Sequence, residues 1–344
     1  MQFRKGLVIV AALSLVGGMA SVPAFANNNN KTNSVVVKSA ADAYGEAWKL
    51  WSKGEGEKSE AFLREQSVKF PSDIRLNLFL AASVASHSAE GEADNYFSHV
   101  VELGAKSEKP APSALAAQHF LHLSDPDTAT EAFAGLTELS RTQGNDPVVV
   151  WLFAQAAERM EKPELAEVAF NSLLKKAKNA PAVVRQGYAD ALEAQGKHFF
   201  ALEHRLKIAK QEASPWTLHA LSSNLRTLAR FSEAEAVAQI SAKNFPSSPQ
   251  AWHDLGVASL GLHRNDVALH HLAKAAQLSE STGDRFDRGA NLLVWASCLE
   301  SQKKFTEAAD KYRQVAALKG VSAEQARTAN LRARAAELAQ SGTN

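Results

Sequence analysis

Two carboxylates of this sequence, Asp190 and Glu193, have a spacing that acid–base chemistry could use. They lie one helical turn apart, so a helix would place them on one face, where they could act as a general acid and a general base. Nothing near them supplies a nucleophile, and paired carboxylates on a helix face are usually solvated. The sequence also has no glycine-rich phosphate loop, nucleophile elbow or His-Glu-x-x-His motif. We therefore expect that the protein is not an enzyme.

Two pairs of histidines could share a metal ion. His119 and His122 are spaced i and i+3, whereas His270 and His271 are adjacent and would point in different directions from a helix. No Cys, Asp or Glu completes a zinc-ligand spacing around either pair. The single cysteine, Cys298, lies among apolar residues, which favours a buried small side chain over a reactive thiol. We expect no metal site and no cofactor.

The charge of the chain is close to neutral. Its 344 residues include 38 Lys and Arg and 37 Asp and Glu, which gives a formal net charge of +1. This balance favours neither nucleic acid nor an anionic membrane surface as the partner. The lysine-rich runs also lack the interleaved aromatic residues of nucleic-acid-binding segments. We therefore expect a protein or peptide partner.

The first 26 residues resemble a secretory signal peptide. Arg4 and Lys5 form the charged start, residues 7–20 form an apolar core, and residues 24–26 form an A-x-A cleavage site. Cleavage after Ala26 would give a periplasmic or secreted protein. No integral membrane span would remain, because no later segment is long and apolar enough. Retention of the segment as a membrane anchor is the alternative.

The rest of the chain divides into four parts by composition and periodicity. Residues 27–38 form a polar, Asn-rich leader that we expect to be disordered, and residues 39–145 carry a degenerate helical pattern. Residues 147–322 repeat with a period close to 34 residues. Residues 323–344 form a capping helix and tail, whose outer Arg and Glu residues would solvate the end of the array. The period shows at the small residue that opens each second helix: Ala166, Ala201, Ala234, Ala268 and Ala308.

The best-preserved repeat spans residues 249–282. It resembles the tetratricopeptide (TPR) family in its large and small residues, which are Trp252, Leu255, Gly256, Ala268, Leu272 and Ala275. The resemblance implies an all-α fold: a right-handed α-solenoid of seven to eight helix–turn–helix repeats with a C-terminal capping helix. Gly256 should lie where the first helix of a pair crosses the second. The same place is taken in other repeats by Ala154, Ala189, Ser222 and Ala296.

The resemblance also implies a concave groove that is lined by the first helices and generally binds peptides or proteins. The positions carried over residue by residue are Trp151, Gln155, Glu158, Gln186, Asp190, Glu193, Trp216, His219, Ser223, Arg226, Gln250, His253, Val257, Leu293, Ser297 and Glu300. The best-known groove of the family grips a C-terminal carboxylate with Lys and Asn. No Lys occupies those positions here, so this ligand class is disfavoured.

The sequence leaves three functions open. The first is an exported scaffold that holds a protein or peptide partner in the groove, in envelope assembly, secretion or polysaccharide export. The alternative is an all-helical toroid enzyme that acts on polysaccharide, although such toroids do not keep a period near 34 residues. The third is a structural homo-oligomer, in which the degenerate N-terminal repeats form the self-interface.

Overall fold

The computed structural model of the protein describes residues 37–87, 91–177, 179–281 and 287–342. These residues form seventeen α-helices and no strand, which confirms the expected all-α class. None of these helices has both the length and the apolar character needed to span a membrane. The expected signal peptide, and all but the last two residues of the expected leader, lie outside the described residues.

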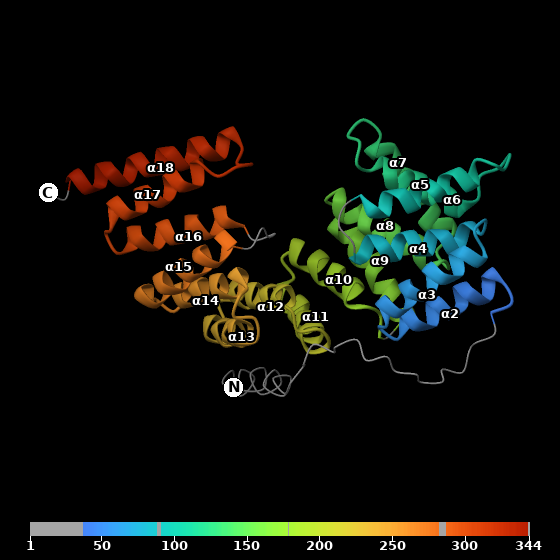
Figure 1. The fold of residues 1–344 in the computed structure, drawn as a ribbon, viewed down its shortest axis with the longest axis horizontal. Coiled ribbons are helices and arrows are strands. Elements are labelled where there is room, and N and C mark those ends of the chain that lie inside the picture. The colour runs from blue at the N-terminus through green and yellow to red at the C-terminus, as the bar shows by residue number, and fades with distance from the viewer. Residues whose placement is uncertain (1–36, 88–90, 178, 282–286, 343–344) are drawn as a thin grey trace. The chain divides into compact units, whose positions relative to one another are not determined.

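The helices follow one another as eight pairs and a final single helix (Figure 1). The first four pairs are α2 (Ala40–Ser52) and α3 (Gly56–Lys69), α4 (Ile74–His87) and α5 (Glu92–Gly104), α6 (Pro112–His122) and α7 (Ala129–Thr142), and α8 (Pro147–Arg159) and α9 (Pro163–Lys176). The next four are α10 (Ala182–Ala194) and α11 (His198–Gln211), α12 (Pro215–Thr227) and α13 (Phe231–Asn244), α14 (Pro249–Gly261) and α15 (Asn265–Ser281), and α16 (Arg288–Ser301) and α17 (Phe305–Ala316). The final helix is α18 (Ala323–Gly342). A solenoid of helix pairs with a terminal helix is therefore confirmed.

Capping side chains and prolines define where many of these helices begin. At the start of α2, the Ser39 hydroxyl accepts a hydrogen bond from the backbone N–H of Asp42. At the start of α12, Ser214 and Thr217 form a reciprocal capping box. Proline occupies the first turn of α6, α8, α9, α12 and α14, where its missing N–H costs no helical hydrogen bond.

The contacts divide the described chain into two units, residues 37–204 and residues 205–342. In the second unit, α12 to α18 stack in sequence order, each helix on the next (Figure 1). The first helices of successive pairs also touch, because α12 contacts α14 and α14 contacts α16. A continuous face of first helices results.

Gly256 lies at the crossing of α14 and α15. A Cβ built on Gly256 would come within 2.7 Å of Cγ and 2.8 Å of Cδ2 of Leu272, which is fully buried. In α12 the corresponding residue is Ser222, which is also fully buried and donates a hydrogen bond of 3.3 Å to the carbonyl oxygen of Ala234 on α13. A small side chain is required at this crossing, so the expected role of Gly256 is confirmed.

In residues 37–204 the first helices of different pairs contact one another. Helix α4 contacts α2, α6 and α8. The Tyr44 hydroxyl on α2 donates a hydrogen bond of 2.8 Å to Oδ1 of Asp146, the N-cap residue of α8. Arg75 on α4 donates to Oδ2 of the same carboxylate through Nε at 3.1 Å and Nη2 at 2.9 Å. These three side chains tie together helices that are far apart in the sequence.

Candidate partner-binding surface

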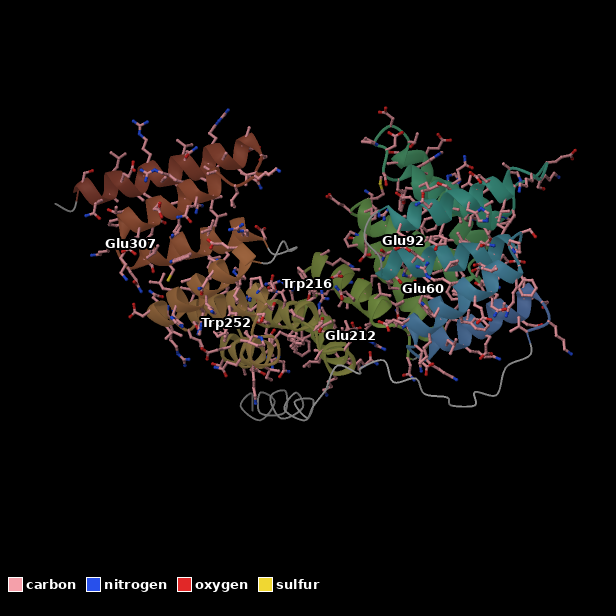
Figure 2. The ribbon with its side chains drawn as sticks, viewed as in Figure 1. Glu60, Glu92, Glu212, Trp216, Trp252 and Glu307 are labelled. Atoms are coloured by element: carbon pink, nitrogen blue, oxygen red, sulfur yellow. The ribbon has the colours of Figure 1, made fainter. Side chains whose placement is uncertain are left out.

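The first helices of the second unit carry most of the side chains expected to line a groove. We call the surface of α12, α14 and α16 that includes Trp216, His219, His253 and Leu293 the first-helix face; Gln250, which was also expected there, is buried. Trp216, labelled in Figure 2, lies in the first turn of α12 and is 49% exposed. Leu293 on α16 is 38% exposed. This face therefore offers apolar surface from two different helices.

Asp254 is the centre of a hydrogen-bonded cluster between α12 and α14. Its side chain is 1% exposed, and its Oδ1 lies 2.8 Å from Nδ1 of His219 and 3.0 Å from Nη1 of Arg226, both on α12. One turn earlier on α14, Nε2 of Gln250 lies 3.4 Å from the same oxygen. The second oxygen, Oδ2, is buried and accepts no hydrogen bond from the described residues. One buried carboxylate thus fixes three side chains of α12 and α14.

The proton on the His219 ring can be assigned from its neighbours. Nδ1 lies 2.8 Å from Asp254 Oδ1 and 2.8 Å from Gln250 Nε2, and a neutral ring nitrogen is either a donor or an acceptor. A carboxylate oxygen can only accept a hydrogen bond, so the 2.8 Å contact with Asp254 Oδ1 requires a proton on Nδ1. We therefore assign the proton to Nδ1, which donates to Asp254.

The electrostatics of the cluster stabilise the ionised form of Asp254. Burial alone would raise the pKa of this carboxyl. The hydrogen bond from His219, together with the positive charge of Arg226, outweighs burial and lowers the pKa below its ordinary value. The guanidinium of Arg226 is only 15% exposed and is committed to this carboxylate. Arg226 is therefore not a free cation of the surface.

His253 extends the polar contacts from α14 to α16. Burial lowers the pKa of this imidazole, which favours its neutral form. Its Nδ1 lies 3.0 Å from Oδ1 of Asn291 on α16 and donates to it. The Asn291 amide in turn donates a hydrogen bond of 3.1 Å to the carbonyl oxygen of Leu272 on α15. Side chains of α12, α14 and α16 and a backbone carbonyl group of α15 thus hold the first-helix face in place.

Trp151 does not lie on an open groove. It is 5% exposed, belongs to the core of residues 37–204, and has its ring centre 6.4 Å from that of Phe120. Trp48 and Phe79, from α2 and α4, lie around the same small cavity as Trp151. The expectation that this tryptophan faces a groove is wrong, because α4 and α8 are in contact and fill the space between the first helices.

The other expected groove residues of the first unit are distributed differently. Gln155 is half-buried and donates a hydrogen bond of 2.9 Å to Glu158 on the same helix. Gln186 is half-buried on α10, and Asp190, one turn later, is exposed. In the second unit, Ser223 is half-buried on α12. A partner contact at any of these residues stays a prediction.

The histidine pairs pack against neighbouring side chains. His119 lies so close to α7 that a Cβ on Gly135 would come within 2.3 Å of its Nε2. The rings of His270 and His271 are 5.7 Å apart, and His271 also lies 5.7 Å from the Trp252 ring. Within the residues that the structure describes, no three His, Cys, Asp or Glu side chains gather in a way that could hold a metal ion.

Two residues of the first-helix face were not among those expected from the sequence. Asp254 directly precedes Leu255 and Gly256, which pack on neighbouring helices, and it is itself fully buried. Asn291 precedes an apolar run on α16 and is 1% exposed. A polar residue next to packing positions was the available signal. The partner of each residue depends on the adjacent repeat.

Comparisons with known proteins identify the fold. No family model matches the sequence, and no curated protein matches it. The structure is similar to yeast Tom70, with a TM-score of 0.50 and 15% identity over 96% of this chain and 70% of that chain. It is also similar to Cut9–Hcn1 of the APC/C, with a TM-score of 0.50 and 15% identity over 88% of this chain and 60% of that chain. A third similar structure is TTC0263, a TPR protein of Thermus thermophilus, with a TM-score of 0.43 and 17% identity over 54% of this chain and 95% of that chain. At these identities the likeness shows the fold alone, and the protein has the TPR-repeat fold.

Proposed function

We propose that the protein is a non-catalytic scaffold that holds an extended segment of a partner protein against the first-helix face. Stacked helix pairs of this fold typically present such surfaces to protein partners. The observation that carries the proposal is the half-exposed indole of Trp216 beside a rigid polar cluster. Tryptophan is enriched among the side chains that dominate binding energy at protein interfaces.

The geometry around Trp216 supports binding rather than bond-making. The His219 ring stands edge-on to the indole, with ring centres 6.5 Å apart and planes at 88°. His219 is itself held by Asp254, so the two rings present a preorganised surface and little ordering entropy is lost on binding. The Asp254 carboxylate is 1% exposed, so a substrate cannot reach it as a base.

The partner segment is not expected to be held by a terminal carboxylate. Arg226 is already committed to Asp254. The exposed contributions of the face are the Trp216 indole and the Leu293 side chain, together with the 30% exposed imidazole of His219. A segment with apolar side chains and neutral hydrogen-bonding groups fits this chemistry best.

A pull-down tests the first-helix face. The tagged protein, Trp216→Ala and Leu293→Ala would be incubated with envelope extracts, and bound proteins would be quantified by mass spectrometry. A specific partner should fall at least tenfold with Trp216→Ala and measurably with Leu293→Ala. Phe199→Ala is the matched control, because Phe199 is 68% exposed on α11, outside this face. Equal recovery with all four proteins would refute the assignment.

We further propose that the protein acts outside the cytoplasm, in envelope assembly, secretion or polysaccharide export. The support is the sequence of residues 1–26, with its charged start, apolar core and A-x-A site. Cell fractionation and N-terminal sequencing should find a mature chain that begins at Asn27 in the periplasm or medium. Ala26→Lys should retain the uncleaved precursor. A full-length chain confined to the cytoplasm contradicts this proposal.

A further inference from the structure

Helix α18 has the repeat position of a first helix, and the described residues hold no second helix paired with it. It packs on α17 through Ala329, Ala333 and Ala336, which are 2–3% exposed. The period places Asn330 thirty-four residues after Ala296, at the crossing position that Gly256 takes in α14. Gly256 is covered there by Leu272 of the second helix, α15. Within the described residues no helix is paired with α18 in this way, and Asn330 is exposed.

The vacant side of α18 is shaped to receive a helix. A shallow hollow of about 460 Å³ lies along it, bordered by six residues: Ala323, Ala326, Arg327, Asn330, Leu331 and Arg334. Ala323 and Ala326 have small side chains, so the hollow is not filled at the start of the helix. In the pairs from α12 to α17 the first helix is covered by contacts with the second helix. A helix is therefore the element that fits this position.

The chemistry of this side is apolar and basic. Leu331 and Leu338 are 63% and 66% exposed and are spaced i and i+7, so they form one stripe along the helix. Arg327 and Arg334 lie along one side of the stripe, and neither pairs with a carboxylate of the described residues. The expected solvating cap thus exposes two large leucines and two unpaired cations on one side.

We propose that this side of α18, defined by Arg327, Leu331, Arg334 and Leu338, is a docking site for an acidic amphipathic helix of a partner protein. The helix would lie on α18 as α15 lies on α14. Its apolar side would cover Leu331 and Leu338, and its carboxylates would meet Arg327 and Arg334. This site uses no residue of the first-helix face, so it is independent of the function proposed above.

A second copy of the chain fits the site less well than an acidic partner. Antiparallel pairing that sets Leu331 of one copy on Leu338 of the other would place Arg334 beside Arg334 of the second copy. Like charges at this distance destabilise a helix pair. The Glu337 carboxylate, which could offset them, is already paired with Arg313. Charge complementarity therefore selects an acidic helix over self-association.

Two labelled peptides test the site on the full chain. The first is a designed amphipathic helix with Leu at heptad spacing and flanking Glu, and the second replaces each Glu with Lys. Fluorescence anisotropy should show that the Glu peptide binds at least tenfold more tightly, and that its affinity falls with added salt. Arg327→Glu combined with Arg334→Glu should reverse the preference. Leu331→Ser combined with Leu338→Ser should weaken the Glu peptide at least tenfold.

The controls replace exposed residues elsewhere. Lys243→Glu changes an exposed charge at the end of α13, and Val68→Ser removes a side chain that is 79% exposed on α3. Both should leave peptide binding unchanged, and circular dichroism should show native helix content in every variant. Peptide preference that survives the arginine reversal overturns the proposal. The proposal is also overturned if light scattering shows a dimer of the protein and Leu331→Ser dissociates that dimer. Binding of α18 to phosphatidylglycerol vesicles in place of the Glu peptide overturns it in favour of a membrane surface.

Discussion

Replacement of Gly256 by alanine tests how closely α14 and α15 approach. The added Cβ would lie 2.7 Å from Cγ and 2.8 Å from Cδ2 of Leu272, whereas carbon atoms in favourable contact are about 3.5–4.0 Å apart. Cγ is the branch point of leucine, so rotation about the outer bond does not move it away. Leu272 is also fully buried. The two helices must therefore separate or Leu272 must leave its rotamer.

The magnitude follows from two opposing effects. Overpacking of a well-packed core costs about 1–3 kcal/mol. Alanine is favoured over glycine within a helix by about 0.5–1 kcal/mol, which offsets part of the cost. At the middle of these ranges a net loss of about 1 kcal/mol of unfolding free energy remains. Gly45→Ala on α2 is the matched control, because a Cβ there meets nothing within 4 Å. It should gain the propensity of about 0.5–1 kcal/mol without a packing cost.

Urea unfolding followed by circular dichroism measures both changes. Gly256→Ala should lower the midpoint with an unchanged slope, and Gly45→Ala should raise it. If the two units unfold in separate transitions, Gly256→Ala should shift only that of residues 205–342 and Gly45→Ala only that of residues 37–204. A Gly256→Ala protein that is as stable as Gly45→Ala would refute the close crossing.

Three further predictions concern Asp254, Tyr44 and Cys298. Asp254→Ala leaves the mostly buried Arg226 without its carboxylate and should cost about 3–5 kcal/mol in urea unfolding, and a cost under about 1 kcal/mol contradicts a buried pair. The pKa of Asp254 is lower in the folded protein than in the unfolded chain, so its ionised form stabilises the fold above about pH 3.9. This stabilisation is lost as the pH falls from there through the folded pKa. Asp254→Asn should therefore make the free energy of unfolding depend less on pH in the acid range. Tyr44→Phe removes a hydrogen bond to the Asp146 carboxylate and should cost about 1.5–3 kcal/mol by thermal unfolding, whereas an unchanged midpoint argues against the bond. Cys298 is 2% exposed and burial raises its pKa, so an aromatic disulfide reagent should label it much more slowly in the native chain than in urea, and equal rates would contradict its burial.

Much of the fold could be predicted from the sequence because its determinants are local. Small residues at a fixed period, such as Ala234 and Ala268, mark where helices cross, and prolines such as Pro249 mark where first helices begin. Each helix pair interacts mainly with its neighbours, so the repeat pattern specifies most contacts. The eight pairs and the final helix follow from this pattern.

The candidate site could be predicted only in part. Motif positions identified Trp216, His219 and His253 on the first-helix face, but the pattern does not say how tightly successive pairs wind. The packing between successive pairs decides whether a tryptophan on a first helix is exposed. It buries Trp151 and leaves Trp216 half-exposed. Asp254 was missed because its role depends on side chains of the preceding repeat, which no single repeat contains.

The hydrogen bond between Tyr44 and Asp146 has a consequence for how the chain responds to force. It joins two residues that are 102 positions apart in the sequence, so α2 cannot detach from residues 37–204 unless its hydrogen bond to the N-cap residue of α8 breaks. The helices of residues 205–342 instead pack on partners one or two places along the chain. Under tension the second unit should unwind pair by pair from its C-terminal end, whereas the first should resist and then yield in one step. A single chain would thus combine a unit that extends gradually under force with a unit that resists until it unfolds at once.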